Sequence, residues 1–442
     1  MLAAGFVLLL QLRTMAITDT LVSGPYADTN IYEVNLRQYT AEGTFTAFAA
    51  HVPRLKDMGV EIIWFMPVTP ISVKNRKGTL GSYYACSSYV QTNPEFGTLD
   101  EFKQLVQLIH DHGMKVIIDW VANHTGWDHE WTITYPDFYN KNADGSFKPP
   151  VENWEDVIHL NFSNQEMRAS MIEAMKFWVE ECNIDGFRCD MAMLVPLDFW
   201  LEARRQLDAV RSLFWLGEFD QWGSDEPYAL AFDVSYSWHW MHVSETFYKH
   251  KQRFHVLDNA LTAYQTKQPY KHMRAFFTSN HDENSWNGTE YEKYGDAALP
   301  LSVFSCMWNG IPLIYSGQEL PNQKRLQFFD KDEIKWKGTP KLHNFYKTLL
   351  TFRKQHPALK AADRRVITWR IATTNNDQLF SFVRKSSNRE VITILNFSDR
   401  KIKFQMSDTR IGGGYEDLFT GKAHSLAESF TIPAWGYLIL HK

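Results

Sequence analysis

The chain has 442 residues, 44 % of them apolar and 15 % aromatic, which predicts one large globular domain with a smaller appendage. Lysine and arginine number 46 against 51 aspartates and glutamates, a net charge of −5 without a long basic run, so the composition excludes a preference for nucleic acid and favours a neutral partner. The four cysteines lie far apart without metal-ligand spacing, so no disulfide framework is predicted.

The sequence opens on one short apolar stretch, Leu2 to Leu12. A bilayer takes roughly 20 residues to span, so we predict no membrane span. Residues 1–20 could be the apolar part of a signal peptide, although the basic region and a clear cleavage site are missing. Alternatively, translation starts at Met15. The first alternative implies a secreted or periplasmic protein, the second implies a cytoplasmic one, and both stay open.

From about Ile31 onward, apolar strand patterns alternate with helical patterns, as in repeated βα units around a parallel sheet. Residues 61–68 form a nearly continuous apolar run, typical of a strand buried on both faces. Thr98 and Glu101 have the spacing of a capping box, and Gly113 is placed to end the helix that they begin. The strand pattern returns at 114–119.

The segment from 125 to 160 is rich in Trp, Asp, Asn and Pro and has no clean period, so we predict a small inserted domain after the third strand. Helical spacing and a fourth strand at 184–191 follow it. The remaining strands are predicted at 213–217, 231–235, 273–279 and 311–315. Eight such units predict an α/β fold, a (β/α)₈ TIM barrel made of residues 21–124 and 161–362.

After the barrel the period changes to that of strands. Residues 379–383 and 391–395 flank a polar turn at Ser387 and predict a β-hairpin, and a last strand is expected at 436–440. We therefore predict that residues 363–442 form a C-terminal antiparallel β-sandwich.

Charged and polar residues stand at the ends of several of these apolar runs, where they are costly to bury without partners or work. They occur in four segments, Asp119 to His124, Arg188 to Asp190, Glu218, and Asn280 to Asp282. Because the ends of barrel strands converge, these residues are expected in one pocket. A single segment of this kind is as readily explained by a structural ion pair or a core histidine, and the joint occurrence favours a site.

Four ordered motifs give the chain a resemblance to the α-amylase family of glycoside hydrolases. They are Asp119-Trp120-Val121-Ala122-Asn123-His124, Gly186-Phe187-Arg188-Cys189-Asp190, Gly217-Glu218, and Phe277-Thr278-Ser279-Asn280-His281-Asp282. The resemblance extends from about Ile31 to the C-terminus. It implies that Asp190 is a nucleophile, Glu218 the general acid and base, and Asp282 a third carboxylate that binds sugar hydroxyls, although Asp282 could alternatively cap the next helix.

The same resemblance implies substrate contacts by Tyr84, His124, Arg188 and His281. Tyr84 aligns with a tyrosine that stacks on the sugar, although Ser88 stands nearby where many relatives have Asp. The two histidines are implied donors to sugar hydroxyls, the alternative being core histidines bonded to carbonyl groups. Arg188 lies two residues before Asp190, hence on the same strand face, and should keep that carboxylate ionised, whereas Glu218 has no such neighbour in sequence and should be the proton donor.

The resemblance leaves calcium as an open cofactor and implies no organic one. Asn123 matches a position that binds calcium in many relatives, and Asn161 lies near another. Leu194 stands where those relatives have His and cannot donate a lone pair, so the usual site is in doubt. Met193 replaces a lysine that helps to bind sugar in them. No metal ligand is therefore assigned.

The function predicted from these residues is retaining hydrolysis of α-glucosides, with starch, maltodextrins or cyclodextrins as substrates and a covalent glycosyl-enzyme intermediate. One alternative is a glucanotransferase or sugar isomerase that uses the same three carboxylates. Another is a glucan-binding relative without catalysis. The expected partner is an α-glucan, and the sequence leaves open the oligomeric state, the α-1,4 or α-1,6 preference and the choice between endo and exo action.

Overall fold

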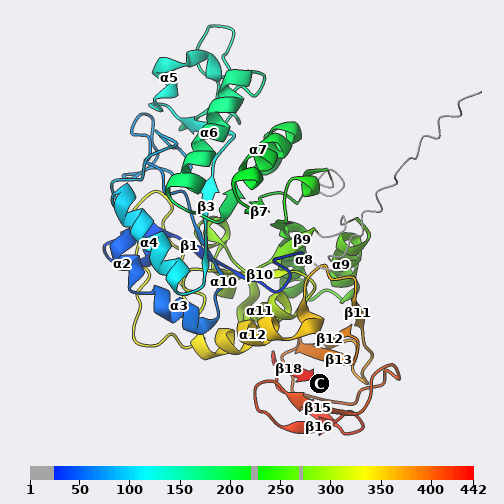
Figure 1. The fold of residues 1–442 in the computed structure, drawn as a ribbon. Helices are drawn as coiled ribbons and strands as arrows, with labels where there is room; N and C mark the ends of the chain where they lie inside the picture. The colour runs from blue at the N-terminus through cyan, green and yellow to red at the C-terminus, as the bar shows by residue number, and fades with distance from the viewer. Residues whose placement is uncertain (1–23, 221–226, 268–271) are drawn as a thin grey trace, which may run out of the picture.

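Eight parallel strands close into a barrel in the computed structural model, which describes residues 24–220, 227–267 and 272–442. Their order around the barrel is β1-β10-β9-β8-β7-β6-β3-β2, with helices outside (Figure 1). The strands are β1 (Ile31–Val34), β2 (Ile62–Phe65), β3 (Lys115–Trp120), β6 (Gly186–Cys189), β7 (Phe214–Gly217), β8 (Val234–Tyr236), β9 (Met273–Phe276) and β10 (Ile311–Tyr315). The predicted (β/α)₈ fold is confirmed.

Several strands are shorter than predicted. β8 begins at Val234 rather than at residue 231, because residues 228–230 form a 3-10 turn before it. β6 ends at Cys189 and β9 at Phe276, so the polar residues that follow them lie beyond the sheet. The apolar pattern therefore located each strand but extended it into the loops that build the pocket.

The barrel strands are buried on both faces, as continuous apolar runs require. In β2, Ile62 and Trp64 belong to the core inside the barrel, whereas Ile63 and Phe65 belong to the core between strands and helices. All four side chains have no exposed surface. This alternation follows from the two-residue period of a strand.

Helices cover the outside of the barrel. In α4, Thr98 Oγ1 accepts from the Glu101 amide at 3.2 Å while Glu101 Oε2 accepts from the Thr98 amide at 2.7 Å, so the predicted capping box is confirmed. Gly113 follows the helix with a φ of 68°. The helices are α1 (Leu36–Tyr39), α2 (Phe45–Ala49), α3 (Val52–Met58), α4 (Leu99–Asp111), α6 (Gln165–Glu181), α7 (Leu197–Val210), α8 (Trp238–Lys249), α9 (His255–Lys267), α10 (Glu290–Tyr294), α11 (Ala298–Met307) and α12 (His343–Gln355).

The segment between β3 and α6 projects from the rest of the barrel around α5 (Trp131–Thr134) (Figure 1). Its short strands β4 (His124–Gly126) and β5 (Val157–His159) pair antiparallel. β4 starts at His124, one residue before the predicted insertion. The pairing fixes both ends of the segment beside the end of β3, and it places residues of the segment at the barrel mouth.

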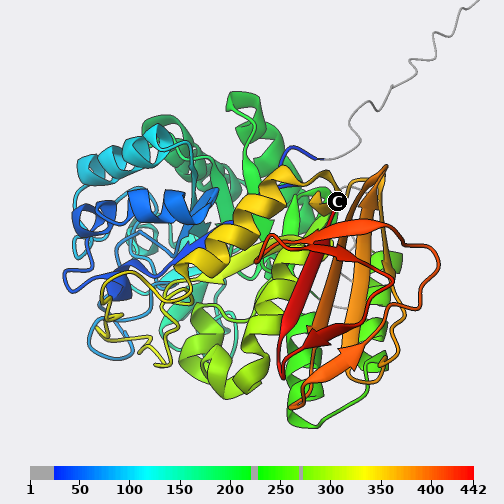
Figure 2. The ribbon, with the colours of Figure 1, turned by 90° about the horizontal axis from the view of Figure 1, so that it is seen from below.

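The C-terminal residues form an antiparallel sheet of order β11-β12-β13-β18-β15-β16, which lies against one side of the barrel (Figure 2). A two-stranded sheet, β14-β17, shares an apolar core with it, so the predicted sandwich is confirmed. The predicted hairpin is β12 and β13, which turn at Ser387 with a φ of 55°. The strands are β11 (Val366–Arg370), β12 (Leu379–Ser386), β13 (Arg389–Asn396), β14 (Ile402–Phe404), β15 (Gly414–Asp417), β16 (Ala423–Ser425), β17 (Phe430–Ile432) and β18 (Tyr437–His441).

Arg384 of β12 joins this sheet to the barrel. Its guanidinium is buried and donates to the carbonyl oxygens of Trp308 at 3.1 Å, Leu359 at 3.0 Å and Lys360 at 2.7 Å. A buried cation of this kind is stable only where its donors are satisfied, so the contact depends on the backbone of both parts.

All four cysteines are buried and unbonded to one another. Within the described ranges no helix combines the length and the apolar character that crossing a bilayer requires. The predicted N-terminal segment 1–20 lies outside the described residues.

Candidate active site

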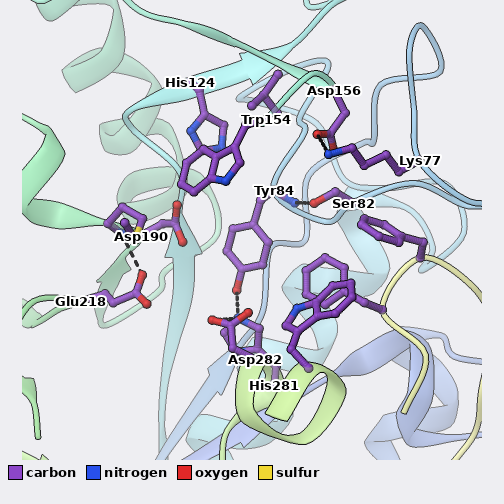
Figure 3. Close-up of a pocket in the computed structure, with 15 residues that line it drawn as sticks. Lys77, Ser82, Tyr84, His124, Trp154, Asp156, Asp190, Glu218, His281 and Asp282 are labelled. Carbon is purple, nitrogen blue, oxygen red and sulfur yellow. Dashed lines mark hydrogen bonds and ion pairs between the residues drawn. The ribbon is translucent and has the colours of Figure 1, made fainter. Parts of the chain in front are cut away.

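A cavity of about 400 Å³ opens at the carboxyl ends of the barrel strands (Figure 3). The sequence-predicted residues Tyr84, His124, Asp190, Glu218, His281 and Asp282 all line it. The other lining residues are Lys77, Ser82, Trp154, Asp156, Val157, Met191, Trp286, Phe328 and Phe329. Arg188 does not line the cavity, because it is fully buried beneath it.

Arg188 organises the carboxylates at the floor of the cavity. Its Nη1 lies 2.9 Å from Asp190 Oδ1 and 2.9 Å from Asp119 Oδ1, and its Nη2 lies 2.8 Å from Glu218 Oε2. Asp190 and Glu218, which directly follow β6 and β7, therefore bind the two terminal nitrogens of one planar guanidinium. This shared contact holds the two carboxylates together. The expected contact between Arg188 and Asp190 is confirmed, and Arg188 also binds Glu218, which the sequence did not indicate.

Glu218 is fixed by a second contact, because its Oε2 accepts a hydrogen bond from the Met191 amide at 2.9 Å. Burial raises the pKa of Glu218, and the charge of Asp190 raises it further, while Arg188 opposes both effects. Burial also raises the pKa of Asp190, with Arg188 the strongest opposing influence. Burial therefore favours the protonated form of these two carboxyls, whereas the charge of Arg188 favours their ionised form.

Asp119, near the end of β3, is buried beside Arg188 and does not line the cavity; the sequence analysis placed it in a motif but gave it no role. Both its oxygens accept from Arg188 Nη1, and Oδ2 also accepts from the Tyr84 hydroxyl at 3.1 Å. Burial raises its pKa to about 7 against the opposing charge of Arg188. Its signal was visible, since a charged residue near the end of an apolar strand needs a partner.

His281 is a cation at neutral pH. Burial alone would lower its pKa, but the carboxylates of Asp282 and Glu33 outweigh burial and raise the pKa to about 9. Nδ1 donates to Glu33 Oε1, and Nε2 donates to the Tyr84 hydroxyl at 2.7 Å. His281 is therefore a charged donor at the pocket wall and not a core histidine bonded to a carbonyl.

Glu33 was missed by the sequence analysis. It is buried inside β1, where burial raises its pKa and the neighbouring His281 lowers it. An acidic residue within an apolar strand was the available signal.

His124 is neutral. Burial lowers its pKa to about 4, and its ring packs edge to face against Trp154 of the insertion with centroids 5.5 Å apart. Its Nδ1 accepts from the Asn123 side-chain amide at 3.2 Å, which leaves Nε2 as the protonated nitrogen. Its ring lines the cavity and also makes a hydrogen bond to the Tyr84 backbone, so donation to a sugar hydroxyl stays a prediction.

Tyr84 lies between the two sides of the cavity (Figure 3). Its ring stacks near Phe328, with centroids 6.2 Å apart and planes 16° apart. Phe328 in turn contacts Trp286 at 5.2 Å between centroids. These aromatic residues form an apolar wall suited to the flat faces of sugar rings. Phe328 and Phe329 come from a loop without a period, and Trp286 comes from the short helical turn Glu283–Asn287, so the sequence gave no signal for them.

Asp282 faces the cavity, and 37 % of its side chain is exposed. It precedes the helical turn Glu283–Asn287, but its side chain makes no capping hydrogen bond there. His281 Nε2 lies 3.4 Å from its Oδ2. The capping alternative is therefore wrong, and the carboxylate is free to bind a ligand.

The two calcium candidates differ in what their side-chain oxygens contact. Asn123 Oδ1 is buried without a hydrogen-bond partner, but Asn161 Oδ1 already accepts from the Ser163 amide at 3.1 Å. The part of the chain that the structure describes holds no group of three or more His, Cys, Asp and Glu residues suited to a metal. Calcium takes six to eight oxygen ligands, so these two amides alone would not complete its coordination.

The fold and the carboxylate-lined pocket define a (β/α)₈ glycoside hydrolase. The family model described as the alpha amylase catalytic domain matches residues 23–154 and 151–339. The chain therefore belongs to the α-amylase family.

Individual relatives agree with this assignment. The α-amylase MalA of Haloarcula japonica is 26 % identical over 390 residues, which are 84 % of this chain and 55 % of that protein. An α-1,4-glucan:maltose-1-phosphate maltosyltransferase of Rhodospirillum rubrum is 25 % identical over 407 residues, 82 % of this chain and 56 % of the relative. The chain thus spans little more than half the length of these two proteins.

A solved structure matches over nearly its whole length. The crystal structure of a noncanonic maltogenic α-amylase, AmyB from Thermotoga neapolitana, has a TM-score of 0.85 and 27 % identity, covering 94 % of this chain and 98 % of that one.

Proposed function

We propose that the chain is a retaining hydrolase of α-glucosidic bonds in starch, maltodextrins or cyclodextrins. Asp190 is the nucleophile, Glu218 the general acid and base, and Asp282 the third carboxylate. The observation that supports these roles best is the placement of Asp190 and Glu218 on one guanidinium at the pocket floor. Retaining glycosidases need their two carboxyls about 5–5.5 Å apart, and a shared arginine keeps such a pair close.

The first step forms an ester between enzyme and sugar. Asp190 Oδ1 is bound by Arg188, so Oδ2 is the oxygen that attacks the anomeric carbon. Glu218 Oε2 is engaged by Arg188 and the Met191 amide, so Oε1 carries the proton. As the bond between the anomeric carbon and the glycosidic oxygen breaks, that proton passes to the leaving oxygen.

The second step releases the sugar. Glu218, now ionised, takes a proton from a water molecule, and the water oxygen attacks the anomeric carbon to displace Asp190. The elevated pKa of Glu218 suits both duties, since the group must give and accept a proton at similar pH.

The remaining pocket residues bind the sugar whose bond breaks. Tyr84 offers a ring face and His124 donates to a hydroxyl group. His281 donates to a sugar hydroxyl from Nε2 when the substrate replaces the contact of that nitrogen with the Tyr84 hydroxyl. Asp282 accepts from hydroxyl groups more strongly as positive charge develops on the ring. Because His281 is charged and His124 neutral, their hydrogen bonds differ in strength.

The test is replacement of Glu218 by Gln. The variant should lose about 10²–10⁴ in kcat on a maltooligosaccharide while its fold survives. With a maltosyl fluoride, whose leaving group needs no proton, the variant should accumulate an adduct that mass spectrometry of peptides places on Asp190.

The matched control is Glu166→Gln, an exposed glutamate in the first turn of α6, which should keep the parent rate. Parental turnover by the Glu218 variant would refute the assignment. An adduct on a different carboxylate would refute the role of Asp190.

A second candidate is transfer of the glycosyl unit to a sugar instead of water. The similarity to the maltosyltransferase of Rhodospirillum rubrum supports this second candidate, and the same three carboxylates would serve the transfer. Product analysis with maltotriose decides between the two, because dominant early formation of longer oligosaccharides indicates transfer, whereas maltose and glucose alone indicate hydrolysis.

A further inference from the structure

One end of the pocket is lined by loops that bind one another. Lys77, in the loop between β2 and α4, has its Nζ 3.2 Å from Asp156 Oδ1 and donates to the Asn153 carbonyl oxygen at 3.2 Å. Asp156 and Asn153 belong to the segment between β3 and α6. Asp156 is nearly buried, whereas 38 % of the Lys77 side chain is exposed. The lysine therefore joins two loops at the rim of the cavity.

The same loop also binds the segment after β10. The Leu80 amide donates to the Phe329 carbonyl at 3.0 Å, and the Thr79 amide donates to Asp330 Oδ1 at 3.0 Å. Gly78 has a φ of 64°, and a Cβ placed on it would lie 2.4 Å from Phe329 Cβ, so the two backbones are in close contact. Three loops thus form one continuous wall.

The wall lies opposite the general acid. In Figure 3, Lys77, Asp156 and Ser82 lie across the cavity from Glu218, with Tyr84 between them. In the proposed mechanism Glu218 protonates the leaving oxygen, so the leaving part of the glucan extends on its side. The walled end then holds the non-reducing part of the substrate.

The cavity size limits what this end can hold. Its volume of about 400 Å³ is near the low end of small-ligand pockets, which measure roughly 300–1,000 Å³. This space, which includes the catalytic carboxyls, has room for a short saccharide beside them. An ammonium group has three hydrogen-bond donors, and the contacts to Asp156 and Asn153 use two of those on Lys77. The third is available for a hydroxyl group of the substrate.

We propose that the wall makes the enzyme cleave from non-reducing chain ends and release products of one or two glucosyl units. Lys77 is the specificity-determining residue, because it closes the wall and donates to the 4-hydroxyl that only a terminal glucosyl unit has free. This inference rests on the proposed function and specifies its substrate as a chain end.

The experiment compares two maltoheptaosides with the same reducing-end aromatic tag, one with a free non-reducing end and one with its 4- and 6-hydroxyls blocked as an acetal. Chromatography of tagged products gives both rates and the cleavage position. We expect kcat/KM for the free-ended substrate to exceed that for the blocked one by about 100-fold or more, because the blocked end is bulkier and cannot offer its hydroxyl.

In Lys77→Ala this ratio should fall at least about tenfold, mainly through a higher KM for the free-ended substrate. Lys77→Arg, which retains a cation at the wall, should keep more of the ratio. The matched control is Lys74→Ala, an exposed lysine of the same loop that does not line the cavity, and it should behave like the parent. Circular dichroism verifies that the variants are folded.

Equal rates on both substrates, or early products of mixed length, would overturn the inference while the proposed function stands. No turnover of either substrate would overturn the proposed function together with it. A parental ratio in folded Lys77→Ala would overturn the role of Lys77.

Discussion

Replacing Arg188 by Met tests how one buried cation sets both stability and the ionisation of the catalytic carboxyls. The side chain has no exposed surface and binds three carboxylates. Removing one partner of a buried ion pair costs about 3–5 kcal/mol. With an unfolding entropy of about 2.1 cal/mol/K per residue, a chain of 442 residues should lose about 3–5 °C in Tm.

The pH dependence should change in a defined direction. Arg188 is the strongest influence that lowers the pKa of Asp190, and an adjacent opposite charge lowers a carboxyl pKa by about 1–3 units. Without it, Asp190 stays protonated to higher pH, so the acid limb of the kcat/KM profile should move up by about that amount. The assay is hydrolysis of a chromogenic maltooligosaccharide between about pH 4 and pH 9, together with thermal melts.

Arg204→Met is the matched control. This arginine also binds two carboxylates, with Nη2 2.8 Å from Asp233 Oδ1 and Nε 3.1 Å from Asp208 Oδ2, but it lies outside the pocket. It should reduce stability without moving the acid limb. Arg188→Lys keeps the charge without the planar fork and should shift the limb less. A folded Arg188→Met variant with the parental acid limb would refute the reasoning.

Three further predictions concern other pocket residues. The pKa of His281 in the folded state, about 9, exceeds its ordinary value of 6.5. The protonated ring therefore stabilises the folded state fully below about pH 6.5, and this stabilisation is lost as the pH rises through about 9. Denaturant melts should show the stability difference between parent and His281→Gln shrink by about 3 kcal/mol from about pH 6 to pH 10, and a pH-independent difference would contradict this. Tyr84→Phe keeps the ring but loses the hydroxyl contacts to neighbouring side chains, whereas Tyr84→Ala loses the ring as well. Stacking on a ring is worth about 1.5 kcal/mol, so KM should be about tenfold higher in Tyr84→Ala than in Tyr84→Phe. Equal KM values in the two variants would argue against stacking. Because Asn161 Oδ1 already accepts from the Ser163 amide and two amides alone would not complete a calcium site, we expect chelation with EDTA to leave Tm and kcat unchanged, and a fall of several degrees would show that calcium binds.

Much of the fold could be predicted because buried parallel strands have a pattern that few other elements share. The run at β2, buried on both faces, is apolar throughout, and the capping box of α4 marks its start by local hydrogen bonding alone. The strand ends were less accurate. Ala231 and Phe232 are apolar and buried but lie outside β8, because the 3-10 turn of residues 228–230 ends at Ala231.

The site was predictable where function places charge at the end of an apolar strand. Asp190 and Glu218 stand at such ends, and both line the cavity. Glu33 and Asp119 are acidic residues within apolar strands and were given no role, because their partners come from distant parts of the chain. Lys77 could not be found, because its place depends on how irregular loops pack, and loops have no period from which to predict contact.

The buried guanidinium of Arg384 also has a consequence for anyone who would shorten this chain. Cut before Val366, the remaining protein would keep the carbonyl oxygens of Trp308 and Leu359 but lose the donor that satisfies them. A replacement domain that covered these carbonyl groups without supplying a donor would leave each of them buried and unpaired, at a cost of about 1–3 kcal/mol. The C-terminal β-sheet is thus no detachable module, and grafting a relative's tail in its place would succeed only if the graft also supplied an arginine at this position.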